Sequence, residues 1–366
     1  MAEERSEASG VTLPDTFRAV YCVSAGSKPR FAIQEERLVL PTVPGDVLVK
    51  VAVSGLSSLD ADVLTREYRS LNRRSSPFRV GYDFSGTILA CNPPSAFSIG
   101  DSVFGSLPFD SPGALAEYLI VPAALCVYKP AQVPHINSGV SGYSLTMAAQ
   151  ALSGLSSEDR LLVLGATSSL GQATIGVAKA FIECEWVAGT SYEDGRATVE
   201  SFGADEVFNW RPGRAAKVGE NRLNLKVPFG ADHQTTRGSP SRHWATPFSY
   251  GRTRHEYQMV VDCVGDEKAY CLISESGNRK SLLPKDVLDR ASRGFSLFSC
   301  RGPTLAEGLP LPSPDPELLE RLSILMGLSR LVMQPDLEIS PRHIIEALER
   351  LCACERMDRG LVAVKW

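Results

Sequence analysis

The first third of the chain alternates hydrophobic and polar positions over short stretches, and glycine and proline separate these stretches. Such alternation is typical of β-strands that have one buried face. The clearest case is residues 47–53, which follow a Pro-Gly-Asp turn. The pattern predicts an all-β, barrel-like module over about residues 16–130. Its expected strands include residues 18–23, 31–33, 47–53, 80–90, 99–105 and 114–121.

The pattern changes after residue 140, where apolar stretches of strand length alternate with stretches of helical spacing. Strands followed by helices predict a parallel sheet covered on both faces. The expected strands are residues 161–164, 186–190, about 206–208 and 259–265, and the expected helices are 143–155, 171–181 and about 194–202. A strand at 331–333, a helix at 341–353 and a strand at 360–365 are expected to end the chain.

These patterns predict an α/β protein with two domains. Residues 16–137 would form the barrel domain, completed by about residues 331–366, and residues 138–330 a doubly wound parallel-sheet domain. Residues 211–257 interrupt the second domain with nine Lys/Arg, three Asp/Glu and little apolar periodicity. A stretch of this kind is unusual inside a compact domain. It is either a solvated surface insertion or translated intron sequence.

The stretch from Leu161 to Ala180 joins a buried strand to a helix through glycine. Its spacing is Gly165-x-x-Ser168-x-x-Gly171. Glycine at such a corner lets the backbone approach a pyrophosphate, and the start of the helix presents free N–H groups to it. The alternative is a glycine turn that binds nothing. The candidate dinucleotide-binding residues here are Gly165, Thr167, Ser168, Ser169, Leu170 and Gly171.

Composition narrows the class of protein. The 366 residues are 43% hydrophobic and 22% charged, and the net charge of −4 does not favour binding to nucleic acid or an anionic membrane. No apolar run is long enough to span a bilayer. The nine cysteines are scattered without a C-x-x-C motif, and the first residues are polar and acidic. We therefore expect a cytoplasmic protein without disulfides.

The order of these parts resembles the medium-chain dehydrogenase/reductase superfamily. The segments that carry the resemblance are residues 53–60, 81–86, 100–103, 113–118, the glycine corner and 202–209. The resemblance implies a GroES-like barrel domain, a Rossmann domain and a nicotinamide cofactor. It is nearest to the zinc-independent branch of quinone oxidoreductases and fungal trans-acting enoyl reductases. Residues 55–58 and 81–83 hold no Cys or His at the zinc-ligand positions of the family, so we expect no metal.

The end of the second strand of a Rossmann domain selects the cofactor. Here Thr190, Ser191 and Tyr192 stand where NAD-selective folds place a carboxylate, and Arg196 follows. This favours NADPH, although Glu193 and Asp194 leave NADH open. Gly265, at the end of a later strand, is the last candidate cofactor contact.

By resemblance, Ser57, Asp62 and Thr146 are the candidate catalytic residues. Relatives have an Asn-Pro pair at Ser57-Ser58 and often a Tyr or Lys at Asp62, and Thr146 matches a threonine near the nicotinamide. A carboxylate at 62 donates a hydrogen bond only if a raised pKa keeps it protonated. The alternative interpretation of Asp62 is a surface residue, and that of Thr146 is a helix cap. Tyr82 either contacts substrate or packs against other side chains. We expect no interaction partner for any of the five histidines.

The resemblance implies a reductase of the C=C bond of an α,β-unsaturated carbonyl. A trans-acting enoyl reductase of fungal polyketide biosynthesis is the preferred form, and a quinone or small-enone oxidoreductase is the alternative. A non-catalytic dinucleotide-binding protein is the alternative of another class. The substrate is either a small molecule or carrier-bound. Five arginines within residues 66–79 either dock an acyl-carrier domain or form a solvated loop. We expect a monomer or homodimer.

Overall fold

A computed structural model describes residues 12–26, 28–64, 76–191, 195–212, 223–226, 259–263, 314–353 and 361–366. The chain divides into two compact units. The first contains Met1–Gln150 and Pro312–Trp366, and the second contains Ala151–Leu311.

The first unit is built on two sheets of short strands. A three-stranded sheet has the order β2-β1-β4, and a seven-stranded sheet has the order β14-β15-β3-β5-β6-β8 with β7 also paired to β3. Nearly all neighbours are antiparallel, as expected for alternating strands joined by short turns. The strands are β1 Thr16–Ser24, β2 Arg30–Arg37, β3 Asp46–Leu56, β4 Phe78–Arg79, β5 Asp83–Cys91, β6 Ser102–Ser106, β7 Tyr118–Pro122, β8 Cys126–Tyr128, β14 Leu337–Ile339 and β15 Val362–Lys365.

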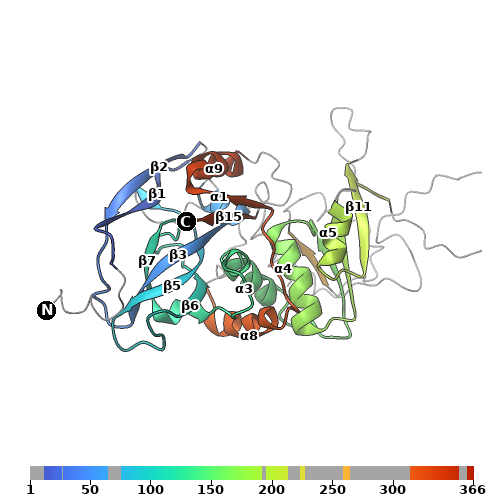
Figure 1. Cartoon of the computed structure of the whole chain (residues 1–366). Helices are drawn as coiled ribbons and strands as arrows, with labels where there is room; N and C mark the ends of the chain where they lie inside the picture. The colour runs from blue at the N-terminus through green and yellow to red at the C-terminus, as the bar shows by residue number, and fades with distance from the viewer. Residues whose placement is uncertain are drawn as a thin grey trace, which may run out of the picture. The chain divides into compact units, whose positions relative to one another are not determined.

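The last strand of the chain pairs with an early one. β15 runs antiparallel to β3, with Val362 opposite Leu56 and Lys365 opposite Val53, and Figure 1 shows the two side by side. Both strands bury apolar side chains in one core with α1 and α9. The helices of this unit are α1 Ser58–Leu64, α2 His135–Ser138, α3 Gly142–Ala151, α8 Pro316–Gly327 and α9 Ile344–Cys352, with short 3-10 turns at Ala123–Leu125 and Pro341–His343.

The second unit contains a sheet in the order β12-β11-β10-β9-β13. Neighbours from β11 to β13 are parallel, and only β12 is antiparallel. Helices follow β9 and β10, so the α/β fold class predicted from the sequence is confirmed. The elements are β9 Arg160–Leu164, α4 Ser169–Val177, a π-helical turn Ala178–Ile182, β10 Trp186–Ser191, α5 Arg196–Ser201, β11 Glu206–Pro212, β12 Leu223–Lys226 and β13 Met259–Asp262.

The order of these strands places β9 between β10 and β13. The chain leaves β9 toward β10 on one side, and β13 pairs with the other side later in the sequence. The order therefore reverses at the carboxyl ends of β9 and β13. Ligands of open α/β sheets bind at such a point, and the Gly165 corner follows directly from β9.

Some sequence predictions are wrong. α1 lies in a region expected to contain almost no helix. Residues 331–333 form no strand: Leu331 and Met333 are buried and alternate with exposed Val332, but the carbonyl of Met333 accepts a hydrogen bond from the side chain of Asn137 (2.7 Å). Part of the 211–257 segment is ordered as β12, and most of its other residues lie outside the described ranges.

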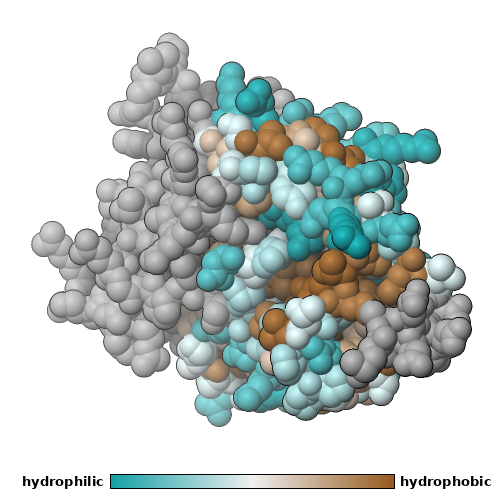
Figure 2. Space-filling model, turned by 90° about the vertical axis from the view of Figure 1, so that its left-hand side faces the viewer, coloured by the Kyte–Doolittle hydropathy of each residue, from teal (hydrophilic) through white to brown (hydrophobic). Residues whose placement is uncertain are grey.

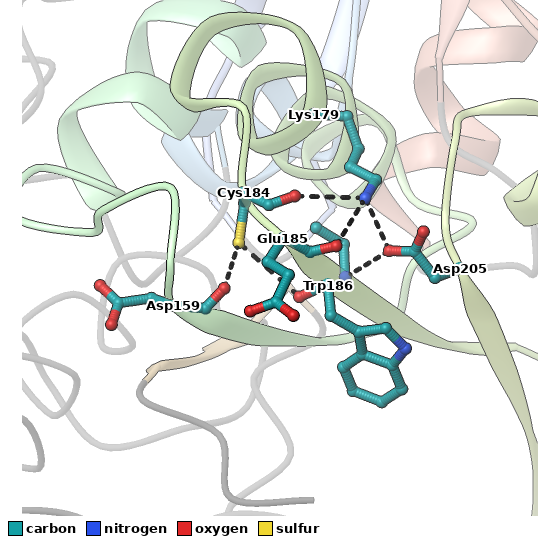
Figure 3. Close-up of polar contacts among 7 residues, drawn as sticks. Asp159, Lys179, Cys184, Glu185, Trp186 and Asp205 are labelled. Atoms are coloured by element: carbon teal, nitrogen blue, oxygen red, sulfur yellow. Dashed lines mark hydrogen bonds and ion pairs between the residues drawn. The ribbon is translucent and has the colours of Figure 1, made fainter.

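A polar network fixes the amino end of β10 (Figure 3). Lys179 Nζ pairs with Asp205 (2.7 Å) and donates to the carbonyls of Cys184 and Glu185, while Asp205 accepts from the Val187 amide (2.7 Å). The network ties the turn after α4 to the loop before β11. Since it lies at the opposite end of β10 from Thr190, we assign it to stability rather than to ligand binding.

Candidate functional site

The glycine corner of the second unit brings α4 close to the end of β9. Gly165 has a φ of 70°, a left-handed conformation that favours glycine. A Cβ on Gly171 would lie 2.4 Å from the carbonyl oxygen of Gly165 and 2.7 Å from the Cα of Ala166. Both glycines are therefore required by the backbone, as in dinucleotide corners.

The start of α4 presents free N–H groups. Ser168 is its N-cap: its hydroxyl donates to the carbonyl of Gly165 (2.8 Å) and accepts from the Gly171 amide (3.0 Å). Within the described residues, the amides of Thr167, Ser169 and Leu170 donate no hydrogen bond. Two of these donors are in the first turn of a nine-residue helix, at its positive end, and the third comes just before the N-cap; together they fit one pyrophosphate.

The hydroxyl of Ser168 is therefore engaged in the helix start. A side chain at this position, where the full G-x-G-x-x-G motif has glycine, either bonds a phosphate or crowds it. In the structure the Ser168 side chain caps α4. Such an N-cap stabilises a helix by about 1 kcal/mol. The fit of the corner to a pyrophosphate depends on backbone amides and not on this side chain.

The residues at the end of β10 and just after it have unequal roles. The hydroxyl of Thr190 accepts from the Gly165 amide (3.0 Å), and its carbonyl accepts from the Ala166 amide (2.9 Å), so Thr190 holds the corner in place. Ser191 is buried at the strand end. Arg196 pairs with Glu200 (2.8 Å), is half exposed, and donates to a backbone carbonyl of β11 (3.2 Å). Tyr192 and Gly265 lie outside the described residues.

Ser57 and Asp60 form a reciprocal cap at the start of α1 in the first unit. The Ser57 amide donates to Asp60 Oδ2 (2.8 Å), and the Leu59 amide donates to the Ser57 hydroxyl (3.3 Å). This arrangement is a capping box with aspartate in place of glutamate. Ser57 thus orients Asp60, which is only 4% exposed. Asp62 lies in α1, and its side chain lies outside what the structure describes.

Thr146 lies inside α3 and is buried. Its hydroxyl donates within the helix, 2.8 Å from the carbonyl oxygen of Gly142, so the helix-cap interpretation is wrong and the contact with a nicotinamide stays a prediction. Tyr82 packs edge-on against Phe109, with ring centroids 5.0 Å apart, which confirms the packing interpretation.

The expectation that no histidine has a partner is wrong for His135. Its Nδ1 lies 2.8 Å from the hydroxyl of Ser85. That hydroxyl donates to the carbonyl of Val103 (3.0 Å) and accepts from Ser138 (2.9 Å). With its one proton given to Val103, the Ser85 hydroxyl accepts from Nδ1 of His135, and this assigns the Nδ1–H tautomer. Burial lowers the pKa of His135, which favours the neutral ring.

Sequence reasoning missed a second buried carboxyl, Asp83 of β5. Its Oδ1 accepts from the hydroxyl of Ser106 (2.6 Å) and the amide of Tyr143 (2.9 Å). A Cβ on Gly142 would lie 2.0 Å from the Ser106 hydroxyl oxygen and 3.0 Å from Asp83 Oδ1, so glycine is needed beside this carboxyl. Burial raises the pKa of Asp83 to about 7, against the effect of its two hydrogen bonds.

Asp60 has a similar electrostatic environment. Burial raises its pKa to about 7, hydrogen bonds from Ser57 oppose the shift, and the negative charge of Asp83 adds to it. Two acidic groups that lie close together in a buried place do not both ionise readily. The first unit therefore holds a pair of carboxyl groups that are partly protonated near neutral pH.

Comparison with known proteins identifies the fold. Residues 43–131 match the alcohol dehydrogenase GroES-like domain. The quinone oxidoreductase from Coxiella burnetii superposes with a TM-score of 0.64 at 16% identity, over 96% of this chain and 99% of that one. The chain has the medium-chain dehydrogenase/reductase fold. The superfamily resemblance predicted from residues 53–60, 81–86 and the glycine corner is confirmed.

Two curated relatives match part of this chain. Mouse prostaglandin reductase-3 is 26% identical over 191 residues, which are 51% of this chain and 48% of that protein. The human protein named NAD(P)H oxidoreductase RTN4IP1, mitochondrial, is 26% identical over 235 residues, 58% of each. The chain thus spans about half the length of the curated relatives it matches.

The described residues contain no group of three or more His, Cys, Asp or Glu side chains placed to hold a metal ion. None of the helices described here is long and apolar enough to cross a membrane. Several apolar side chains reach the surface, and Figure 2 shows an area of them on one face.

Proposed function

We propose that this protein is an NADPH-dependent, zinc-free reductase of C=C bonds conjugated to a carbonyl. The observation that carries the proposal is the start of α4, where the free amides of Thr167, Ser169 and Leu170 meet a glycine-lined corner. This geometry fits a dinucleotide pyrophosphate. The names of the two curated relatives, a prostaglandin reductase and an NAD(P)H oxidoreductase, support a redox role.

Different residues of the chain have separate proposed roles in this reaction. Bound NADPH would supply a hydride for the β-carbon of the substrate. Gly165 and Gly171 admit the pyrophosphate, the three amides hold it, and Thr190 fixes the corner. Thr146 is the proposed neighbour of the nicotinamide, and Ser57 orients the buried acid Asp60.

For the substrate, we propose an enoyl chain of the kind that trans-acting reductases take from polyketide synthases in fungal secondary metabolism. A quinone or a small enone is the second candidate, supported by the likeness of the fold to a quinone oxidoreductase. An acyl-carrier domain is the proposed partner. Of the five arginines proposed to dock it, Arg79 lies 3.6 Å from Glu36, and the other four lie outside the described residues. A cytoplasmic monomer or homodimer stays our prediction.

The first experiment separates these functions. NADPH fluorescence is titrated with the protein, and NADPH oxidation is then followed with a crotonyl thioester and with a benzoquinone. We expect saturable binding and faster oxidation with the thioester. Faster oxidation with the quinone would favour the second candidate. Binding without oxidation would favour the non-catalytic protein, and absence of binding would reject every redox proposal.

The second experiment tests cofactor choice at Arg196. Replacing it with alanine should weaken NADPH binding about 10-fold and leave NADH binding unchanged, because a charged hydrogen bond contributes about 1.5 kcal/mol or more. Glu200→Gln is the matched control. It releases Arg196 from its ion pair and should keep or tighten NADPH binding. Equal losses for both cofactors in Arg196→Ala would contradict a contact with the 2′-phosphate.

A further inference from the structure

β2 is an outer strand of the three-stranded sheet in the first unit. Among the described strands it pairs with β1 alone, and five of its eight residues are exposed. Large apolar side chains are exposed on this strand and just after it, namely Ile33 (39%), Val39 (54%), Leu40 (40%) and Val43 (57%). Figure 2 faces the side on which β2 lies in Figure 1, and it shows an area of apolar side chains there. An open strand edge beside exposed apolar residues is a place where another chain pairs.

The backbone groups on the open edge of β2 can be assigned residue by residue. In an antiparallel pair, successive residues present their N–H and C=O groups to alternate sides of the strand. The Leu38 amide donates to the Asp15 carbonyl (2.9 Å) in the register of β1 and β2, so the even-numbered residues bond to β1. The N–H and C=O groups of Phe31, Ile33 and Glu35 therefore point away from the sheet. Such a row of donors and acceptors is the template for one more strand.

The charges along β2 are complementary to those of a second copy. Arg30 and Glu36 are an even number of residues apart, so their side chains lie on one face of the strand. We consider a second copy of β2 that runs antiparallel with Ile33 opposite Ile33. Arg30 of each copy then lies opposite Glu36 of the other, and the residues with outward backbone groups meet one another. Each such pair of opposite charges contributes about 0.2–1 kcal/mol.

A different register loses this complementarity. Pairing centred on Gln34 would also bring outward backbone groups together, but it would place Ile33 opposite Glu35 and Phe31 opposite Arg37. No opposite charges would then face each other across the two strands. The charges thus favour one register, and its symmetry is that of an isologous dimer, in which both copies use the same surface.

Glu36 has room for the proposed contact. Its neighbours in its own chain are Arg79 and Tyr21. Arg79 Nε lies 3.6 Å from its Oε1, which is longer than a hydrogen bond, and the side chain is still 27% exposed. A carboxylate accepts several donors at once, so Glu36 can keep these neighbours and also accept Arg30 of another copy.

We propose that β2 pairs antiparallel with β2 of a second copy of this chain, centred on Ile33, and so forms a two-fold homodimer. The two sheets then become one sheet in the order β4-β1-β2-β2-β1-β4. Each copy contributes the outward N–H and C=O groups of Phe31, Ile33 and Glu35 and one end of both ion pairs. The inference uses the first unit alone and does not depend on the proposed reductase function. A single pair of strands is a small interface, so the dimer is weak and dissociates on dilution.

The first test blocks the outward amide of Glu35. Proline at this position removes an N–H group that β1 does not use, so each chain keeps its own sheet while the new ladder is interrupted. Glu35→Ala is the matched control, because it removes the same side chain and keeps the amide. Light scattering after size-exclusion chromatography measures the mass from about 1 to about 100 µM protein, the range in which weak dimers dissociate. Wild type and Glu35→Ala should rise from the mass of one chain toward that of two, and Glu35→Pro should stay at one.

The second test addresses the register. Arg30→Glu and Glu36→Arg each place like charges opposite each other at both ends of the paired strands. Each variant alone should dimerise at least about 10-fold more weakly than wild type. Mixed in equal amounts, the two variants regain opposite charges at both ends and should form a dimer with one chain of each. Arg30→Lys, which keeps the charge, is the control that remains informative if Glu36→Arg does not fold beside Arg79.

Three results would overturn the inference. The first is a wild-type mass of one chain at every concentration. The second is a dimer that persists in folded Glu35→Pro, because the copies would then meet at another surface. The third is a mixture of folded Arg30→Glu and Glu36→Arg that is no more dimeric than either variant alone, or equal dimerisation of Arg30→Glu and Arg30→Lys. Circular dichroism establishes the fold of each variant.

Discussion

Replacing Gly171 with alanine is expected to lower NADPH affinity at least 100-fold. The added Cβ would lie 2.4 Å from the Gly165 oxygen and 2.7 Å from the Ala166 Cα. Both contacts are with backbone, so the first turn of α4 must move. That movement misplaces the amides of Ser169 and Leu170, and loss of two charged hydrogen bonds at about 1.5–3 kcal/mol each accounts for the effect. Fluorescence titration of NADPH measures it.

The matched control is Gly176→Ala in the same helix. Gly176 lies past the corner and is only half-buried, and alanine favours a helix interior by about 1 kcal/mol relative to glycine. We expect normal NADPH affinity for this variant. Circular dichroism and thermal unfolding show whether Gly171→Ala keeps its fold, with an expected cost of about 1–3 kcal/mol. Normal NADPH affinity in a folded Gly171→Ala protein would contradict the proposed corner.

Much of the fold could be predicted because its signals are local. The strand β10 and the helix α9 follow from runs and spacings of apolar residues that the fold then buries. The failures have local causes too. α1 was missed because seven residues are too short for a clear period, although Ser57 and Asp60 carry the spacing of a capping box.

The candidate site was likewise predictable only where its residues are neighbours in the sequence. The glycine corner is contiguous in the sequence, so its residues could be named before its geometry was known. The buried acids Asp60 and Asp83 and the buried Tyr143 come from α1, β5 and α3, and they are separated by 23 and 60 positions. No spacing in the sequence predicts that the Tyr143 amide donates to Asp83. The one available signal was Asp83 itself, a carboxylate within an apolar strand segment where burial is the rule.

The stability of the wild-type protein should fall as the pH rises from about 5 to about 7, through the contribution of Asp60 and Asp83. Burial raises the folded-state pKa of each to about 7, above the ordinary value of 3.8. The folded state therefore holds more protons than the unfolded state between these values. By linkage, this contribution to the free energy of unfolding is present at low pH and is lost as the pH approaches the folded-state pKa. For each group, the slope of the free energy of unfolding against pH has an upper limit of about 1.4 kcal/mol per pH unit.

Asp60→Asn isolates this contribution from the other carboxylates of the chain. Asparagine keeps an oxygen to accept the Ser57 amide and has no charge to bury. The variant should lose part of the slope, so its stability relative to wild type should improve from about pH 5 to about pH 7. Urea unfolding at a series of pH values measures the difference, and Glu200→Gln reports the effect of removing an exposed carboxylate. A constant difference across the series would mean that Asp60 is ionised throughout, and would contradict a pKa raised by burial.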